Sequence, residues 1–203
     1  MKFTKGYWMN LPGVTNTDAV QVREVKVEND RVYLYTVPYH ADMRAMGGPL
    51  LEMYISSPQP DIIRTEAYHF MGGNQKMPAF ELNDAHCALE VENTETTVTI
   101  KSGNTKLVIG KNPCSFDYYY KDKKLTSIGN RFGNAMISTI STPDGNYMRA
   151  QMNLDIGEKV YGLGERFTPY VKNGQTVETW NEDGGTCTEI SYKNIPFYMT
   201  NKG

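Results

Sequence analysis

The chain has 203 residues and a formal net charge of −2. This charge argues against the basic face that nucleic-acid binding needs, and no apolar run approaches the roughly 20 residues that span a bilayer. We therefore expect neither a nucleic-acid partner nor a membrane. A chain of about 200 residues is within the range of one undivided all-β domain.

The first half of the chain predicts strands almost throughout. Valines at positions 20, 22, 25 and 27 alternate with one slip, which predicts a strand with a β-bulge over residues 20–27. Further strands, rich in valine, isoleucine and tyrosine and separated by turn residues, are expected at residues 31–37, 50–55, 62–70, 96–101 and 106–109.

The second half continues this pattern. Tyr118–Tyr120 is typical of a strand covered on both faces. Apolar and polar residues alternate over Met148–Leu154, which predicts a strand that buries its apolar side. Asn173 and Gly174 predict a two-residue hairpin. No segment sustains helical periodicity over three turns. We predict an all-β fold, an antiparallel β-sandwich with few or no helices, formed by residues 1–203 as one domain.

The cysteines and histidines carry no metal-binding pattern. Three cysteines leave at least one unpaired, and none is in C-x-x-C spacing. Because no signal peptide precedes them, we expect a reducing cytoplasm. The three histidines are far apart and are expected to be solvated or packed in the core, so we expect neither a metal nor a cofactor. These residues are Cys87, Cys114, Cys187, His40, His69 and His86.

The segment from Val160 to Asn201 is the most informative part of the chain. Gly162 and Gly164 flank one leucine, so the backbone there must turn tightly or pass close to another segment. Trp180 is expected to be buried in the sandwich rather than to stack on a sugar ring. A polar loop follows it and ends in Asp183–Gly185, where a carboxylate can bind a ligand or its own backbone.

The same segment resembles a known family. Its motifs Gly-Leu-Gly-Glu-Arg-Phe, Trp-Asn-Glu-Asp-Gly-Gly-Thr and Asn-Ile-Pro-Phe-Tyr-Met-Thr-Asn are similar to the end of the N-terminal β-sandwich domain of family 31 glycoside hydrolases, in particular bacterial α-xylosidases. Over residues 1–159 the resemblance is weaker and rests on similar landmarks, such as Trp8 followed by Leu11–Gly13. Glu182 stands where a basic residue is more usual, and Cys187 where serine is ordinary. The resemblance implies a galactose-mutarotase-like supersandwich.

The resemblance also implies a longer protein. In the family the sandwich continues past this point and a catalytic (β/α)8 barrel follows. Asn194–Thr200 is typical of a strand, and Asn201–Gly203 of a turn into another one. An unpaired terminal strand leaves backbone groups unsatisfied. We therefore expect residues 1–203 to be a truncated domain.

Hydrolysis of a glycosidic bond with retention needs two carboxyl groups about 5 to 5.5 Å apart. The resemblance assigns both to aspartates of the barrel, so we expect no catalytic residue in this chain. It implies instead that the loop Trp180–Thr186 lines the site of the leaving-group sugar, with Asp183 and Gly184 binding an α-xyloside or α-glucoside. A carboxylate can accept hydrogen bonds from two hydroxyls, and glycine permits close approach.

The expected partners are therefore a carbohydrate and the protein's own C-terminal barrel, while a homo-oligomer is left open. Glu165 and Arg166 are expected to form an ion pair that holds the turn. Two other functions stay open. A stand-alone carbohydrate-binding module predicts an exposed row of aromatics, and the chain has only two tryptophans. A mutarotase-like epimerase needs a base and a histidine acid that converge on one carbon.

Overall fold

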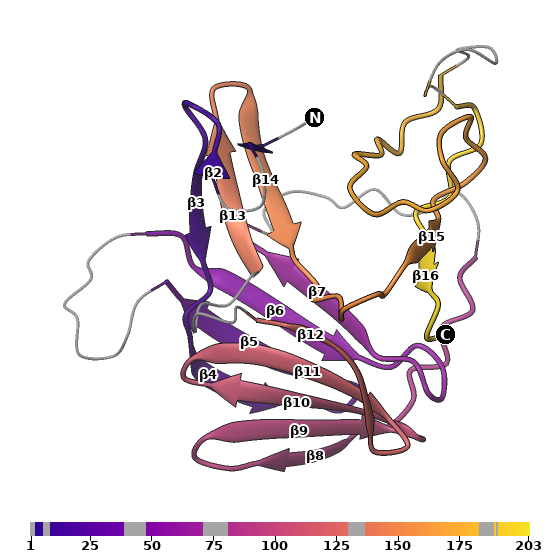
Figure 1. Ribbon diagram of the computed structural model, residues 1–203. Helices are drawn as coiled ribbons and strands as arrows, with labels where there is room; N and C mark the ends of the chain where they lie inside the picture. Colours follow the sequence, from indigo (N-terminus) through magenta and orange to yellow (C-terminus); the bar gives the residue numbers. More distant parts are fainter. Residues whose placement is uncertain are drawn as a thin grey trace. The chain divides into compact units, whose positions relative to one another are not determined.

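The computed structural model describes residues 3–5, 9–38, 48–70, 81–129, 137–182, 189 and 191–203. Over these ranges the chain forms strands and loops without a helix, so the all-β prediction is confirmed (Figure 1). Consequently, no described helix is long and apolar enough to cross a membrane. Two compact units are distinguished, Pro12–Asn153 and Met1–Leu11 with Leu154–Gly203. The organisation of residues 1–203 as one domain stays a prediction.

A four-stranded antiparallel sheet forms one layer of the larger unit. Its strands, in spatial order, are β4 (Gln21–Val27), β5 (Arg31–Val37), β6 (Leu51–Ser56) and β7 (Arg64–Tyr68). The register between β4 and β5 shifts between Val22 and Glu24, so the predicted bulge is confirmed. Alternate residues of β6 are buried, as the period of two in the sequence predicts.

A five-stranded antiparallel sheet forms the second layer. Its spatial order is β12 (Lys123–Ile128), β11 (Cys114–Tyr120), β10 (Thr105–Lys111), β9 (Thr97–Ser102) and β8 (Glu90–Asn93). Every pair of neighbours in space is also consecutive in the chain, so each connection is a short hairpin. Tyr118 and Tyr119 on β11 are half-buried, whereas Tyr120 is exposed.

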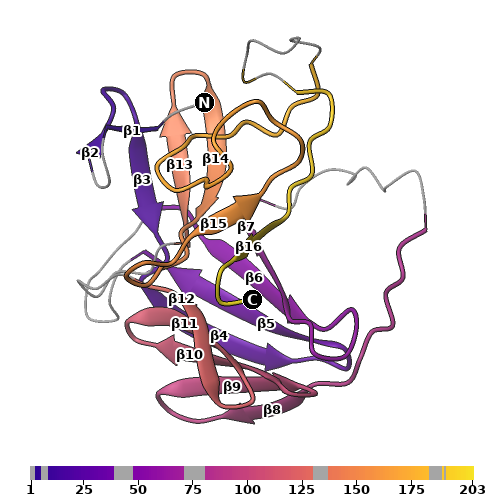
Figure 2. The same ribbon diagram turned by 45° about the vertical axis from the view of Figure 1, so that its right-hand side comes forward.

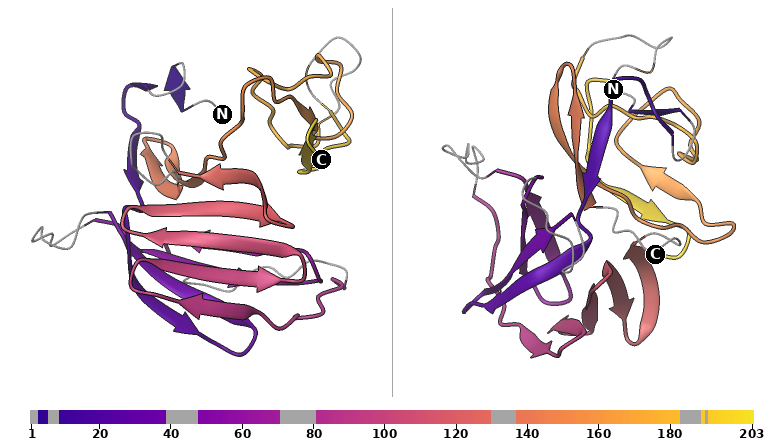
Figure 3. Two further views of the ribbon diagram at one scale, coloured as in Figure 1. Left: turned by 60° about the horizontal axis from the view of Figure 1, so that its bottom comes forward. Right: turned by 90° about the vertical axis from the view of Figure 1, so that its left-hand side faces the viewer.

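The hydrophobic core lies between these two sheets, which face each other in Figure 3. Each sheet contributes fully buried aliphatic or aromatic side chains, and each such side chain stabilises the fold by roughly 1.5–3 kcal/mol. The hydroxyl groups of Ser57 and Ser102, one from each layer, form a buried hydrogen bond of 2.7 Å. The predicted β-sandwich is confirmed. The core includes Val32, Leu34, Met53, Ile55, Val98, Ile100, Leu107, Ile109 and Phe116.

A third sheet joins β3 (Thr15–Asp18), β13 (Ile137–Thr142) and β14 (Gly145–Ala150). The prediction that Met148–Leu154 buries its apolar side is wrong. Strand β14 ends at Ala150, and Met148 is 40% exposed. Arg149 takes the covered side instead, because its guanidinium donates to Ser138 Oγ at 3.0 Å and to Asp18 Oδ1 at 3.1 Å.

The smaller unit contains two short antiparallel pairs. One joins β1 (Thr4–Lys5) and β2 (Met9–Asn10). The other joins β15 (Val160–Gly162) and β16 (Tyr198–Thr200), which lie side by side in Figure 2. The strand predicted at residues 194–200 is confirmed for its last three residues.

The hairpin predicted at Asn173 and Gly174 is only partly formed. Gln175 N–H donates to Lys172 O at 3.0 Å, which closes a turn, but neither flank is a strand. The side chain of Asn173 bonds another segment instead. Its Oδ1 accepts from Val160 N–H at 2.8 Å, and its Nδ2 donates to Glu158 O at 3.0 Å. Hydrogen bonds from the Asn173 side chain thus replace the main-chain bonds of a partner strand.

Candidate functional site

Gly162 and Gly164 allow two stretches of backbone to pass in close contact. Both have a left-handed conformation, with φ of +108° and +90°. A Cβ atom on Gly162 would lie 2.6 Å from Phe197 O, and one on Gly164 would overlap Lys193 O. Glu165 N–H donates to Lys193 O at 3.0 Å. The close approach predicted from the sequence is confirmed, and only glycine accommodates it.

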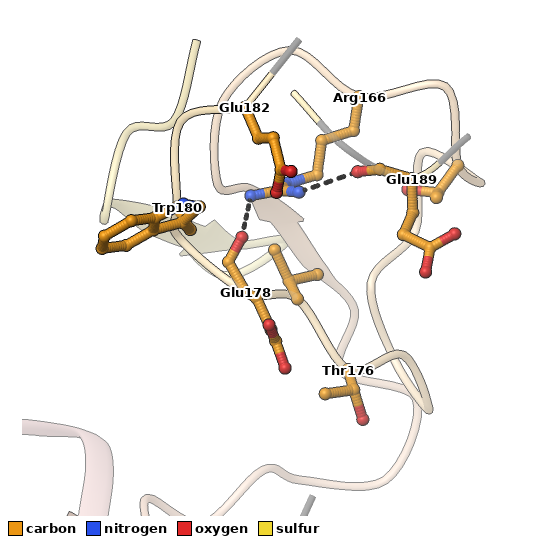
Figure 4. Close-up of a pocket in the computed structure, with 8 residues that line it drawn as sticks. Arg166, Thr176, Glu178, Trp180, Glu182 and Glu189 are labelled. Carbon is orange, nitrogen blue, oxygen red and sulfur yellow. Dashed lines mark hydrogen bonds between the residues drawn. The ribbon is translucent and has the colours of Figure 1, made fainter. Parts of the chain in front are cut away.

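Arg166 follows this turn and reaches three parts of the chain (Figure 4). Its Nε donates to the nearby Leu163 O at 3.3 Å. Its Nη1 donates to Glu189 O at 3.1 Å, and its Nη2 donates to Glu178 O at 2.6 Å. Nη2 also donates to Oδ1 of Asn194. The planar fork of a guanidinium carries five N–H donors, so one side chain can hold several acceptors at once.

These bonds join the segments on either side of residues 183–188. We call residues 178–182 the first stem, and residues 189 and 191–194 the second stem. Asn194 links the stems a second time, because its Nδ2 lies 2.7 Å from Trp180 O and 2.9 Å from Asn181 Oδ1. Glu182 N–H also donates to Ser191 O at 3.0 Å. The two stems are therefore held together by main-chain and side-chain bonds.

The ion pair predicted between Glu165 and Arg166 is replaced by another. Oε1 of Glu165 lies 2.7 Å from Nζ of Lys193. The hydrogen bond that Lys193 donates to this carboxylate raises the pKa of Lys193. Glu165 pairs with Lys193 at the surface, and Arg166 binds main-chain oxygens instead. Nothing in the sequence points to this role of Arg166, because main-chain acceptors have no residue signature.

A cavity of about 230 Å³ lies against the stems (Figure 4). Arg166, Glu178, Trp180, Glu182 and Glu189 line it. Carboxylates accept hydrogen bonds from hydroxyl groups, and an indole ring can pack on an apolar face. The prediction of a buried Trp180 is wrong, since this side chain is 73% exposed. Trp180 also lines a second, more open cavity of about 380 Å³.

The sequence-predicted site residues Asp183 and Gly184 lie outside the described residues, as do Gly185 and Cys187. Their role in substrate binding stays a prediction. The described positions nearest to them in the chain are Glu182 and Glu189, and both line the 230 Å³ cavity. The structure thus describes the first three residues of the predicted substrate loop, Trp180–Glu182, and resumes at Glu189, beyond its predicted end.

Two charged side chains of the smaller unit, Glu158 and Lys172, are buried. Glu158 is 7% exposed, and its Oε2 accepts from Asp155 N–H at 2.8 Å, which lowers the pKa of Glu158 despite burial. Lys172 is 8% exposed and donates to Thr168 Oγ1 at 3.1 Å and to Pro169 O at 2.9 Å. Loss of solvation lowers the pKa of Lys172.

Of the three histidines, His40 lies outside the described residues. His86 does converge with carboxylates: its Nδ1 lies 3.4 Å from Asp30 Oδ2 and 3.7 Å from Asp84 Oδ1. This cluster is on the surface, and the His86 side chain is 61% exposed. Neither cavity described above has a histidine in its wall. Within the described ranges, no group of three or more potential ligand residues could hold a metal ion.

Comparison with known proteins defines the class. Residues 52–203 match the family of the glycosyl hydrolase 31 N-terminal galactose mutarotase-like domain, and the chain belongs to this family. It is 33% identical to the alpha-xylosidase XylQ of Lactiplantibacillus pentosus and 34% identical to an alpha-xylosidase of Emericella nidulans. Both alignments cover 100% of this chain but only 27% and 29% of those relatives. The resemblance predicted from residues 160–203 is confirmed.

Solved structures support the fold alone. The cycloalternan-forming enzyme of Listeria monocytogenes has a TM-score of 0.71 at 20% identity, over 95% of this chain and 17% of that one. The family 31 dextranase of Flavobacterium johnsoniae has a TM-score of 0.68 at 19% identity, over 90% of this chain and 21% of that one. In each case this chain corresponds to a small part of a longer enzyme.

Proposed function

We propose that this chain is the N-terminal, non-catalytic domain of a retaining α-glycosidase of the α-xylosidase type. The parent protein would hydrolyse terminal α-xylosyl or related α-glucosyl linkages on a C-terminal barrel. Two relatives named as alpha-xylosidases, each aligned over the whole chain at 33% and 34% identity, support this substrate class. The chain spans less than three tenths of either relative, which leaves ample length for a catalytic domain.

The distribution of apolar side chains carries this proposal. The fully buried hydrophobic residues of the described chain all lie between Ala19 and Ile140. By contrast, residues 154–203 expose large side chains such as Ile156 at 98% and Tyr170 at 78%. Such exposure marks an interaction surface, since burial of each side chain stabilises a protein by roughly 1.5–3 kcal/mol. We infer that the catalytic barrel covers this surface.

The second contribution of the domain is a substrate loop. We infer that Asp183 and Gly184 bind the leaving-group sugar of an α-xyloside or α-glucoside. The joined stems and the cavity beside them, with Trp180 and Glu182 in its wall, support this placement. We further propose a cytoplasmic location, supported by the free thiols of Cys87 and Cys114.

The test compares the 203-residue chain with the full-length gene product for release of 4-nitrophenol from its α-xyloside. We expect turnover only by the longer protein. Asp183→Ala should then raise KM for a substrate with a sugar leaving group, with Asp144→Ala, a turn residue of the larger unit, as the matched control. Turnover by the short chain, or a longer protein inactive on every α-xyloside and α-glucoside, would overturn the proposal.

A stand-alone carbohydrate-binding module is the second candidate. The exposure of Trp180 and Tyr170, at 73% and 78%, favours it, because exposed aromatics can form a sugar platform. That function requires the 203-residue chain to bind xylose-containing oligosaccharides by itself. Titration calorimetry with the short chain decides between the candidates, since a non-catalytic support domain does not need such affinity.

A further inference from the structure

We propose that Arg166 is a positioning residue for the leaving-group sugar. Its guanidinium fixes the separation of the two stems and thereby sets the shape of the 230 Å³ cavity that both stems line. The inference rests on the proposed function for its substrate, while the bonds of Arg166 are independent of it. Arg166 itself need not contact the sugar.

The choice of acceptors supports this role. Arg166 donates to one main-chain oxygen of each stem, Glu178 O at 2.6 Å and Glu189 O at 3.1 Å. A third bond, to Leu163 O at 3.3 Å, anchors the guanidinium to the turn that follows Gly162. A lysine ammonium is a point donor without a fixed fork, so it cannot hold both stems in this geometry.

The bond from Arg166 to Asn194 extends the clamp to the cavity wall. Asn194 accepts from Arg166 and approaches Trp180 O at 2.7 Å with its own amide nitrogen. Loss of the guanidinium therefore removes a bond from each stem and the donor to Asn194 Oδ1, while Asn194 keeps its own bonds to Trp180 and Asn181. The stems are then held together with fewer hydrogen bonds, one of which is the main-chain bond from Glu182 N–H to Ser191 O. The Glu182 amide is thus the local reporter of the clamp.

Figure 4 shows why Arg166 should affect sugar binding and not only the stability of the fold. The guanidinium bonds both stems, and Glu182 and Glu189 line the same cavity. A shift of either stem moves the wall of that cavity. The reacting carboxyl groups of the proposed enzyme are on its barrel, so a change at Arg166 should alter sugar affinity more than the chemical step.

The experiment uses the full-length gene product with Arg166→Lys, and with Arg149→Lys as the matched control in the larger unit. Two substrates are compared: 4-nitrophenyl α-xyloside, and a disaccharide with an α-xylosyl group on glucose. For Arg166→Lys we expect KM for the disaccharide to rise about tenfold, as for one lost hydrogen bond to a charged group. We expect kcat, and KM for the aryl substrate, to change by less than about twofold.

Hydrogen exchange at the Glu182 amide forms the second arm, with an expected increase of about tenfold in Arg166→Lys and none in Arg149→Lys. Unchanged exchange at Glu182, or an equal KM change for both substrates, overturns the positioning role. If the unmodified protein hydrolyses neither substrate, the proposed function fails, and the exchange arm alone still tests the clamp. Should Arg166→Lys not fold, Asn194→Ala is the second variant: it removes one acceptor of Arg166 together with the links from Asn194 to Trp180 and Asn181, so faster exchange at Glu182 is again expected.

Discussion

Substitution of Gly164 by alanine tests whether close backbone contact shapes this site. Gly164 has a φ of +90°, and a Cβ there would overlap Lys193 O and lie 2.9 Å from Ile195 N. Gly174 is the matched control, because its φ of +76° is similar but nothing lies within 4 Å of its added Cβ. The two variants share the backbone penalty and differ in the steric one.

The expected magnitudes follow from these terms. A non-glycine residue in left-handed backbone costs about 1–2 kcal/mol, which applies to both variants. At Gly164 the overlap must also displace the carbonyl of Lys193, which breaks the 3.0 Å bond from Glu165 N–H. That loss and the strained contacts add about 2 kcal/mol. Gly164→Ala should therefore open this segment about 30-fold more often than Gly174→Ala.

Hydrogen exchange of the Glu165 amide, measured in the full-length gene product, is the assay. Gly164→Ala should accelerate this exchange strongly, and Gly174→Ala only slightly. Equal acceleration in the two variants would refute the reasoning, because it would mean that the Lys193 segment yields without cost. Slower exchange in Gly164→Ala would refute it too.

Three buried side chains allow further predictions. Phe116→Ala should lower the free energy of unfolding by about 3–5 kcal/mol in urea titrations, because its ring is fully buried. Burial raises the pKa of Cys114 from 9.0 to about 12. The stability that this thiol contributes is complete below pH 9 and is lost as the pH rises toward 12. Cys114→Ala should therefore reduce the fall of the unfolding free energy with pH over that range. The hydrogen bond from Asp155 N–H lowers the pKa of Glu158 below 4.5, so its contribution is complete above pH 4.5 and is lost on acidification. Glu158→Gln should flatten the acid limb of a thermal-melting series.

Some features of this protein were determined by local sequence alone. The valine alternation over residues 20–27 predicted both β4 and its bulge, because side chains in a strand alternate between faces with a period of two. Gly162 and Gly164 predicted a close approach, since only glycine tolerates a neighbour in place of its Cβ. Such signals depend on the residue and its immediate neighbours, and they are independent of what packs on them.

Tertiary structure decided the features that depend on a distant partner. The alternation at Met148–Leu154 predicted a strand with its apolar side buried, but Arg149 takes the covered side instead because it pairs with Asp18. Asn173 and Gly174 predicted a turn, yet the Asn173 side chain bonds Val160 in place of a second strand. The three main-chain acceptors of Arg166 left no trace in the sequence, because every residue carries the same carbonyl group and only the fold brings a given carbonyl within reach.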